Sequence, residues 1–214
     1  MKFFLGTKGR MTQVFDESGV AHPATLVSAA PMTVTQVKST EVDGYSAVQV
    51  GAGERKEKNL SKPVLGHLSA GGGSSFGGKG KPYPRYLREY APDSALEKGA
   101  SIDISIFAAG DIVEVAAISK GKGFQGVVKR HGFSGGPRSH GQKNKERAPG
   151  SIGGGGRAGG RVIKGMRMAG RMGGDRVTVR NLRILQVDTE TNTLVISGAI
   201  PGRPGTLVEV HGTK

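Results

Sequence analysis

Cysteine and tryptophan are missing from this 214-residue chain, and aromatic residues make up only 5% of it. Without cysteine there can be no disulfide, no thiolate nucleophile and no cysteine-bound zinc. Acidic residues are also scarce, because 17 Asp and Glu stand against 31 Lys and Arg, which gives a formal net charge of +14. No apolar run approaches the roughly 18 residues of a membrane span, and the N-terminal apolar run is too short for a signal peptide. The sequence predicts a cytoplasmic protein that binds a polyanion, nucleic acid before an anionic membrane surface.

Glycine and positive charge are concentrated in one quarter of the chain. Residues 120–176 contain 18 of the 37 glycines and 14 Lys and Arg against two acids, Glu146 and Asp175, whereas the rest of the chain has a net charge of only +2. A run such as Gly153 to Gly156 cannot bury enough apolar surface to offset the entropy of ordering it. The segment is therefore either a solvated linker or an element ordered by a partner. Apolar residues dispersed along it, such as Phe124 and Phe133, favour the second interpretation.

The remaining sequence predicts short β-strands. They are expected over 11–15, 24–39 (two strands broken at Pro31), 42–53 (with the hairpin signal Asp43-Gly44), 101–119 (two strands joined at 109–111), 177–188, 192–200 and 205–212. Helical periodicity occurs only near 58–70 and 84–92. Because closing a sheet removes its exposed edges, we predict a mainly β fold: an antiparallel β-barrel with a long Gly-rich basic internal loop and a small mixed insertion.

This interpretation divides the chain into five parts. Residues 1–57 are the first part of the barrel, 58–92 a helical and loop insertion with a low-complexity stretch at 71–82, and 93–119 further barrel strands. Residues 120–176 are a basic Gly-rich loop that penetrates RNA, and 177–214 are the C-terminal barrel strands. Because both ends of the basic loop attach to one barrel, we expect it to project as a looped arm.

The sequence signals for an enzyme or a metal site are weaker than those for a polyanion-binding protein. Gly121 to Gly126 match the G-x-G-x-x-G pattern of dinucleotide-binding enzymes, but Gly132 and a later Gly-Gly-Pro interrupt the helix that this motif should open. No histidine has a second ligand at metal-binding spacing, and no Ser/His/Asp set can be assembled, so we predict no catalytic residues and no metal ligands. His131 and His140 are expected to stack on bases or bind phosphates. Asp175 is expected to pair with a neighbouring arginine.

The basic segment has the chemistry of an RNA-binding element. Glycine lets the backbone approach phosphates closely, Lys and Arg displace counterions, and Phe, His and Arg offer surfaces on which bases stack. In 164–176 the cations could face phosphates while Met166, Met168 and Met172 fill irregular gaps or pack back on the barrel. A nonspecific RNA or DNA chaperone remains an alternative, because composition alone does not encode sequence readout.

Five stretches, taken in order, resemble the large-subunit ribosomal protein L3 family. They are GTKGRMTQVF (6–15), SKGKGFQGVVKRHGFSGGPRSHG (119–141), APGSIG (148–153), KGMRMAGRMGGDRVTVRNL (164–182) and LVISGAIPG (194–202). The resemblance covers the whole chain except the loop 71–82. It implies a six-stranded, translation-factor-like barrel in a structural, non-enzymatic constituent of the large ribosomal subunit.

The resemblance also implies a function and partners. The family binds rRNA directly near the 3′ end of the large-subunit molecule, nucleates subunit assembly and extends a loop toward the peptidyl-transferase centre. The implied partners are rRNA and neighbouring large-subunit proteins, L14 and L19, with no membrane and no small-molecule substrate. The implied location is the ribosome in the cytoplasm. No cofactor is expected beyond Mg²⁺ associated with rRNA.

The expected site residues combine positions implied by the resemblance with further cationic and polar residues read from the sequence itself. The expected RNA contacts are Lys8, Arg10, Lys120, Lys122, Lys129, Arg130, His131, Arg138, His140, Lys143, Lys145, Arg147, Ser151, Arg157, Arg161, Lys164, Arg167, Arg171 and Arg176. The expected loop tip near the peptidyl-transferase centre comprises Arg147, Pro149, Gly150, Ser151, Ile152, Gly153 and Gly154.

Two residues depart from the family pattern. Gly154 stands where many bacterial members have a glutamine, which in some of them is methylated. Arg10 stands in place of the second glycine of G-T-K-x-G-M-T, where it either changes the backbone shape of the first strand or adds a phosphate contact.

Overall fold

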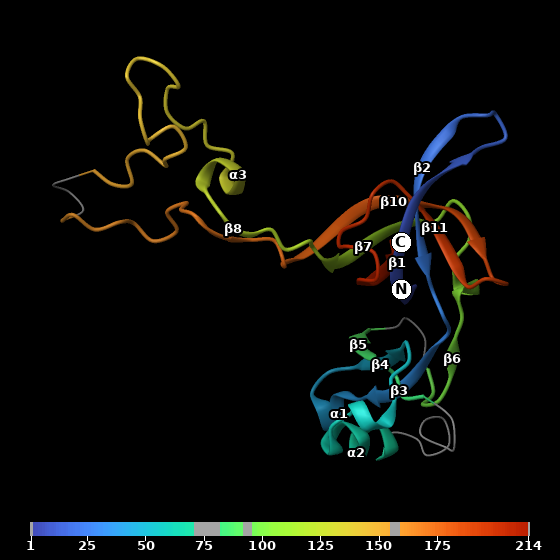
Figure 1. Ribbon diagram of the computed structural model, residues 1–214. Helices are drawn as coiled ribbons and strands as arrows, with labels where there is room; N and C mark the ends of the chain where they lie inside the picture. Colours follow the sequence, from blue (N-terminus) through green and yellow to red (C-terminus); the bar gives the residue numbers. More distant parts are fainter. Residues whose placement is uncertain (1, 71–81, 92–95, 155–158, 214) are drawn as a thin grey trace. The chain divides into compact units, whose positions relative to one another are not determined.

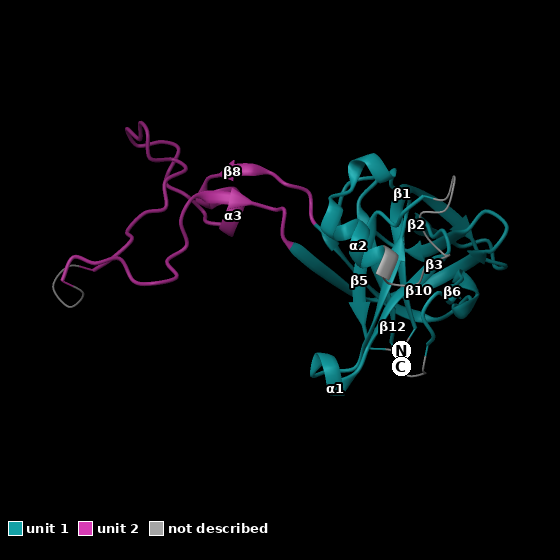
Figure 2. Cartoon of the chain, turned by 90° about the horizontal axis from the view of Figure 1, so that it is seen from below, with its two compact units in different colours: residues 1–118, 176–214 teal, residues 119–175 magenta. Residues whose placement is uncertain are grey.

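The computed structural model describes residues 2–70, 82–91, 96–154 and 159–213. The chain divides into two compact units, shown in different colours in Figure 2. Unit 1 combines residues 1–118 with 176–214, and unit 2 comprises residues 119–175. The predicted mainly β class is confirmed, because strands dominate the secondary structure of the described residues.

Six antiparallel strands of unit 1 form a closed barrel (Figure 1). Around the barrel the strands follow the order β1 (Phe3–Phe15), β12 (Leu207–Gly212), β7 (Ile112–Ile118), β10 (Arg176–Asp188), β11 (Thr193–Ser197) and β2 (Ala21–Ser28). Each strand pairs with the next, and β2 pairs with β1 to close the sheet. Strands from both ends of the chain therefore lie side by side, which brings residues 3–7 against 207–211.

The barrel is filled mainly by aliphatic side chains, which alternate along the strands with more exposed residues. In β12, Val208 and Val210 are fully buried while the residues between them are only partly covered. This alternation follows from the two-residue period of a strand, which sends successive side chains to opposite faces. Phe4 and Ile184 are also fully buried, and the same core cluster continues into the second sheet of unit 1. The core of unit 1 is therefore continuous.

A second, four-stranded sheet lies outside the barrel. Its order is β5 (Tyr86–Tyr90), β4 (Ala47–Ala52), β3 (Met32–Lys38) and β6 (Ser101–Ile102). The short elements between its strands are α1 (Thr40–Asp43), η1 (Glu57–Asn59), α2 (Lys62–Ala70) and, after β6, η2 (Ile104–Ile106). The assignment of all strands in 1–57 and 93–119 to the barrel is thus wrong for β3, β4 and β6. Local sequence does not distinguish them, because strands of both sheets are short and rich in valine and other apolar residues.

Three local predictions are corrected by the structure. The helix expected over 84–92 is wrong, because residues 86–90 form β5 and pair with β4 from Val48↔Tyr90 to Ala52↔Tyr86. Hydrogen bonding to a free strand edge overrides the helical propensity of Leu, Arg and Glu there. The strands β3 and β4 do pair, but α1 and the left-handed Gly44 replace a two-residue turn. Before residue 109, the predicted strand reduces to β6 and η2.

Arg10 occupies an irregular part of β1. The β1–β2 register shifts between Lys8 and Met11, which places Arg10 at the irregularity. Its backbone does not have a positive φ, unlike His140, Asn181 and Asn192. The strand therefore accepts a side chain at this position without the backbone freedom of glycine.

Candidate nucleic-acid interface

The two ends of unit 2 are held together by a ladder of backbone hydrogen bonds. The Ser119 N–H donates to the Asp175 carbonyl at 2.8 Å, and the Lys122 N–H donates to the Met172 carbonyl at 2.8 Å. Beyond them, β8 (Gly123–Gln125) pairs with β9 (Gly170–Met172). Gly173 has a φ of +74°, and a Cβ there would lie 2.1 Å from the Lys120 carbonyl oxygen. The limbs can approach this closely only because residue 173 is glycine.

A short helix, α3 (Val127–His131), fastens the outgoing limb to the returning one. Val127 is the only buried hydrophobic residue among the described residues of unit 2. The Met168 carbonyl oxygen accepts hydrogen bonds from Arg130 Nη1 at 2.8 Å and from His131 Nε2 at 3.0 Å. The helix ends at Gly132, whose φ is +73°. Arg130 and His131 of α3 thus stabilise the loop through the backbone of the opposite limb.

The G-x-G-x-x-G pattern lies in this neck. Its residues Gly123 to Gln125 form β8, and α3 has five residues. The pattern therefore serves strand pairing and a single helical turn, whereas a dinucleotide site needs a long helix in a βαβ unit. No group of three or more His, Asp or Glu among the described residues could hold a metal ion.

Positive charge in unit 2 is almost unpaired. Within the described residues 119–154 and 159–175 there is a single ion pair. It joins Arg138 Nε to Glu146 Oε1 at 2.8 Å, and both side chains are substantially exposed. The expected pairing of Asp175 with an arginine is wrong for these described residues, since Asp175 instead bonds Ser119 through its own backbone N–H and carbonyl. Apart from Arg130, which bonds the Met168 carbonyl, the remaining described lysines and arginines of this region are exposed. They can therefore neutralise an external polyanion.

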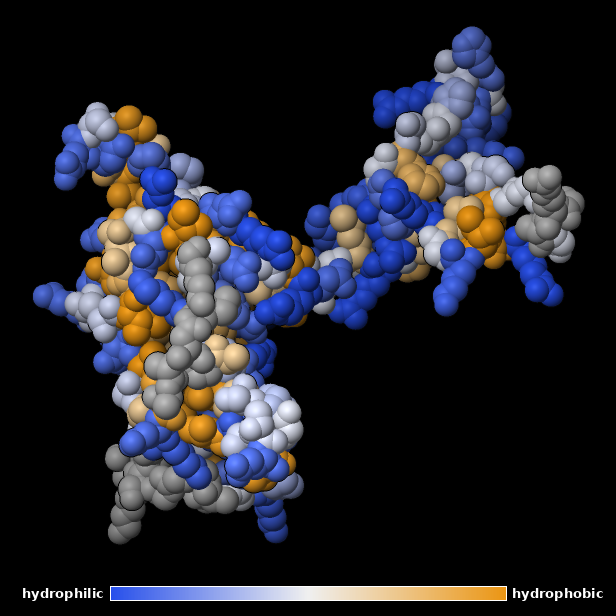
Figure 3. All heavy atoms as spheres, turned by 180° about the vertical axis from the view of Figure 1, so that it is seen from behind, coloured by the Kyte–Doolittle hydropathy of each residue, from blue (hydrophilic) through white to orange (hydrophobic). Residues whose placement is uncertain are grey.

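Unit 2 also exposes large apolar side chains. Phe124 is 77% exposed and Ile163 is 64% exposed, and Ile152, Val162 and Met168 are exposed to a smaller extent. Figure 3 shows, on one face, hydrophilic side chains over much of unit 2 with hydrophobic ones among them. Flat aromatic faces beside cations are the surfaces on which unpaired bases stack.

A second cationic surface lies in unit 1. A groove of about 440 Å³ is lined by Arg85, Arg88, Arg176 and Arg203 with one acid, Glu209. Glu209 accepts hydrogen bonds from Arg88 Nε at 2.7 Å and from Arg176 Nη2 at 2.5 Å. Burial raises the pKa of the Glu209 carboxyl, but these two hydrogen bonds outweigh it and hold the pKa below its ordinary value. Glu209 therefore stays ionised and orients two guanidinium groups toward the groove.

Sequence reasoning selected only Arg176 from this groove. Arg88 lies in β5, Arg85 is the residue before β5, and Arg203 lies in the turn before β12. Arg85 and Arg88 belong to the second sheet or its edge, whereas Arg176 and Arg203 lie in or beside barrel strands. The packing of that sheet against the barrel brings them together, and Arg88 and Arg176 meet at Glu209. The one local signal was the arginine- and tyrosine-rich stretch around 83–90, where the Arg85 guanidinium lies 5.1 Å from the Tyr86 ring centroid.

Comparison of the sequence with known proteins shows which family the chain belongs to. The sequence model of the family described as Ribosomal protein L3 matches residues 89–204. The large ribosomal subunit protein uL3 of Trichormus variabilis is 51% identical over 212 residues, covering 98% of this chain and 96% of that protein. Those of Nostoc punctiforme and Thermosynechococcus vestitus are 53% and 47% identical over the same length, covering 98% of this chain and 96% and 95% of theirs.

The chain belongs to the ribosomal protein L3 family. Membership makes it a ribosomal protein with a structural, non-enzymatic role, and the names of its relatives place those proteins in the large ribosomal subunit. None of the helices in the described part of the chain is long and apolar enough to cross a membrane.

Most residues predicted from the L3 resemblance to bind RNA lie in unit 2. Those with exposed positions are Lys120, Lys122, Lys129, Arg138, His140, Lys143, Lys145, Arg147, Ser151, Arg161, Lys164, Arg167 and Arg171. Arg130 and His131 are half-buried against the Met168 carbonyl, Arg10 and Arg176 are exposed in unit 1, and Arg157 lies outside the described residues.

Lys8 has a different position from the rest. It is half-buried in β1, and its ammonium group donates hydrogen bonds to the Ile200 carbonyl at 2.6 Å and the Gly202 carbonyl at 2.9 Å. The structure therefore gives its charge a role inside unit 1, where it ties β1 to the connection between β11 and β12.

The residues expected at the loop tip, from Arg147 to Gly154, are exposed apart from the half-buried Ala148. Ser151 Oγ donates a hydrogen bond to the Gly153 carbonyl at 3.1 Å. A Cβ at Gly154 would meet no atom within 4 Å, and Gly154 does not have a positive φ. The chain itself therefore has room for the side chain that other family members carry at this position.

Proposed function

We propose that this chain is a primary rRNA-binding protein of the large ribosomal subunit, with unit 2 as its main RNA-binding element. It binds near the 3′ end of the large-subunit rRNA, nucleates subunit assembly and extends its loop tip toward the peptidyl-transferase centre. Its barrel is of the translation-factor-like class and lies beside L14 and L19. The observation that carries the proposal is that most positive charges in the described part of unit 2 have no acidic partner.

The balance of energies in unit 2 supports an external partner. Its described residues bury one apolar side chain, so little hydrophobic stabilisation offsets the conformational entropy of a glycine-rich chain. RNA phosphates supply the missing counter-charges, and each cation that meets a phosphate releases condensed counterions. The exposed Phe124 and Ile163 then gain cover from bases and sugars.

The arginine groove extends the proposed interface to unit 1. Arg85, Arg88, Arg176 and Arg203 carry four positive charges against the single charge of Glu209. Because Glu209 fixes two of the guanidinium groups, they can bind a phosphate without first losing side-chain freedom. We therefore add Arg85, Arg88 and Arg203 to the proposed RNA contacts and remove Lys8.

The deciding experiment measures affinity against salt for two RNAs of equal length. One is a fragment from the 3′ region of large-subunit rRNA, and the other is an unrelated structured RNA. If six to ten phosphates are contacted, affinity for both should fall by about 10³–10⁵ between 50 and 200 mM salt. At least tenfold preference for the rRNA fragment supports the proposal. Equal affinities overturn it in favour of a nonspecific RNA chaperone.

The position of the loop tip can be tested separately. Because the chain has no cysteine, Ser151→Cys creates a unique attachment point for an iron chelate that generates hydroxyl radicals. In large subunits assembled with this variant, cleavage near the peptidyl-transferase centre supports the proposed path of unit 2. Cleavage confined to other regions contradicts it, and Ser18→Cys, on the β1–β2 turn of unit 1, is the matched control.

A further inference from the structure

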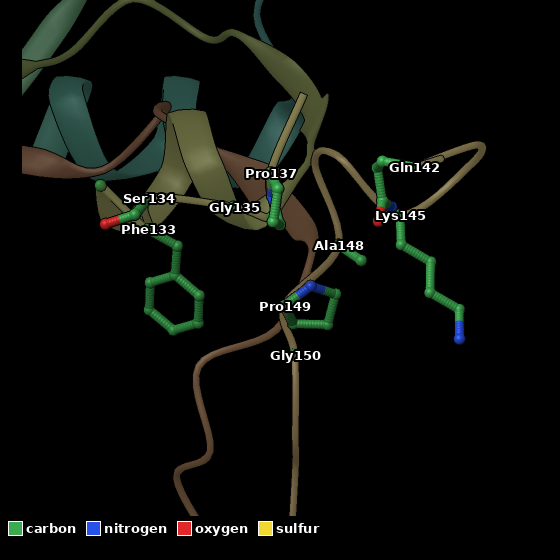
Figure 4. A pocket seen from close by; sticks show the side chains of 11 residues that line it. Phe133, Ser134, Gly135, Pro137, Gln142, Lys145, Ala148, Pro149 and Gly150 are labelled. Atoms are coloured by element: carbon green, nitrogen blue, oxygen red, sulfur yellow. The ribbon is translucent and has the colours of Figure 1, made fainter. Parts of the chain in front are cut away.

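Unit 2 contains an open pocket of about 520 Å³ that the proposed phosphate contacts do not explain (Figure 4). It is lined by residues 132–137, by Gln142 and Lys145, and by residues 148–150 at the start of the expected loop tip. Its volume lies within the range of about 300–1,000 Å³ that is typical of small-ligand pockets.

Backbone contacts hold the walls of this pocket in place. Gly135 has a φ of +80°, and a Cβ there would lie 2.2 Å from the Glu146 carbonyl oxygen. The Gly136 N–H donates a hydrogen bond of 2.8 Å to that same oxygen, and Arg138 pairs with the Glu146 side chain. The segment around Gly135 and Gly136 therefore crosses the segment around Glu146 backbone against backbone, which fixes the walls of the pocket.

The lining combines flat apolar surfaces with hydrogen-bonding groups. Phe133, Pro137 and Pro149 contribute rings, and Figure 4 shows Phe133 and Pro149 on two separate stretches of the backbone. The Phe133 ring centroid lies 6.0 Å from that of His131, at an interplanar angle of 44°. Gln142 and Lys145 provide an amide and an ammonium group, and no acidic side chain lines the pocket.

We propose that this pocket receives one unpaired nucleotide of the RNA, with its base stacked on Phe133 and its phosphate beside Lys145. The inference rests on the proposed function and deepens it, because it names a splayed-out base as the element that the loop recognises. Unpaired bases are the usual targets of sequence-specific RNA recognition, since both their faces and their edges are accessible. A cationic pocket with an aromatic wall and an amide fits a nucleotide better than an apolar or cationic peptide side chain.

Stacking and charge can be separated by their salt dependence. Phe133→Leu keeps apolar volume but removes the flat ring, so it should weaken binding of the full chain to the rRNA fragment by about tenfold. The slope of log affinity against log salt should stay unchanged, because no cation is lost. Lys143→Gln, which lies outside the pocket, should show the reverse: a slope smaller by about one and a weaker effect at high salt.

A pair of glycines provides a matched control for the shape of the pocket. Gly135 and Gly141 both have a positive φ, of +80° and +76°, so alanine meets similar backbone strain at either position. A Cβ at Gly141 meets no atom within 4 Å, whereas one at Gly135 collides with a backbone carbonyl. Gly135→Ala should therefore weaken binding as Phe133→Leu does, and Gly141→Ala should resemble the unchanged chain.

Base-specific chemical probing completes the test. One nucleotide of the rRNA fragment should be protected by the unchanged chain and by Gly141→Ala, and should become reactive with Phe133→Leu and Gly135→Ala. If the unchanged chain prefers rRNA but these two variants keep its affinity and protections, the pocket proposal is overturned while the proposed function stands. If the unchanged chain shows no preference for rRNA, the proposed function itself fails.

Discussion

Unit 1 and unit 2 are stabilised in opposite ways. In unit 1, side chains such as Phe4, Ile184 and Leu194 are fully buried in one continuous core, and acids such as Glu209 and Asp111 are paired with cations. In the described part of unit 2 one apolar side chain is buried and one ion pair forms. Unit 1 therefore has a core of its own, whereas the described part of unit 2 is held mainly by backbone hydrogen bonds and leaves most of its charge for a partner. The same chain therefore contains a body that protein chemistry holds together and an element suited to RNA.

The largest effect should come from emptying the core of unit 1. Phe4→Ala should lower the free energy of unfolding by about 3–5 kcal/mol, because a fully buried phenylalanine leaves a cavity. Phe124→Ala, at an exposed site in unit 2, should leave it nearly unchanged. Urea unfolding measures both. A comparable loss for Phe124→Ala would show that unit 2 has a core of its own and would contradict the contrast between the units.

The next effect concerns protection by RNA. Trypsin should cut the free chain first in unit 2, at exposed sites such as Lys143 and Lys145, while unit 1 resists. With the rRNA fragment at 100 times its dissociation constant, cleavage in unit 2 should slow by about a hundredfold, since only the free fraction is cut. Equal resistance with and without RNA would mean that unit 2 is stabilised by itself.

A smaller effect is expected from a lysine that serves unit 1. Lys8→Met removes the two hydrogen bonds to the Ile200 and Gly202 carbonyls and should lower the free energy of unfolding by about 1.5–3 kcal/mol. Lys129→Met, on the exposed face of α3, should not change it. Thermal unfolding of the two variants distinguishes a lysine bound by the protein from one accessible to RNA.

Single charges in unit 2 should have measurable but small effects on binding. Lys129→Gln should reduce the slope of log affinity against log salt by about one, because one phosphate contact is lost. Lys58→Gln, at an exposed position in η1 of unit 1, should leave the slope unchanged. If both variants changed the slope equally, binding would depend on the total charge of the chain. That result would contradict the proposal that unit 2 is the main RNA-binding element.

The smallest effect concerns an exposed turn of unit 1. Hydrogen bonds from His22, the Val20 N–H and Ser18 lower the pKa of the Asp16 carboxyl from 3.8 to about 2. Because the folded-state pKa is lowered, any stabilisation from this carboxylate is present above about pH 4 and is lost as the pH falls through 2. An NMR titration of Asp16 should show this midpoint, and His22→Ala should raise it. An unchanged midpoint in His22→Ala would show that the ring does not hold the carboxylate.

The sequence predicts strands well where neighbours in the chain also pair. Strands β10 and β11, predicted over 177–188 and 192–200, are antiparallel neighbours joined by a short turn. Predictions failed where distant segments pair, as for β5, which depends on the edge of β4, and for β3, β4 and β6, which leave the barrel. The candidate site follows the same division. The charge of unit 2 could be counted, but the arginine groove and the Phe133 pocket join residues that no local pattern connects.

By itself, the sequence determined composition-level properties: a mainly β fold, a basic Gly-rich segment between residues 120 and 176, and the absence of any cysteine chemistry. These depend on residue types and short periods, which need no knowledge of distant contacts. Only the tertiary structure decided which strands close the barrel, that Lys8 serves unit 1, and that Gly135 and Glu146 cross to form a pocket. Such features depend on hydrogen bonds and close approaches that residue types and short periods do not encode, because they form only together with the whole set of contacts.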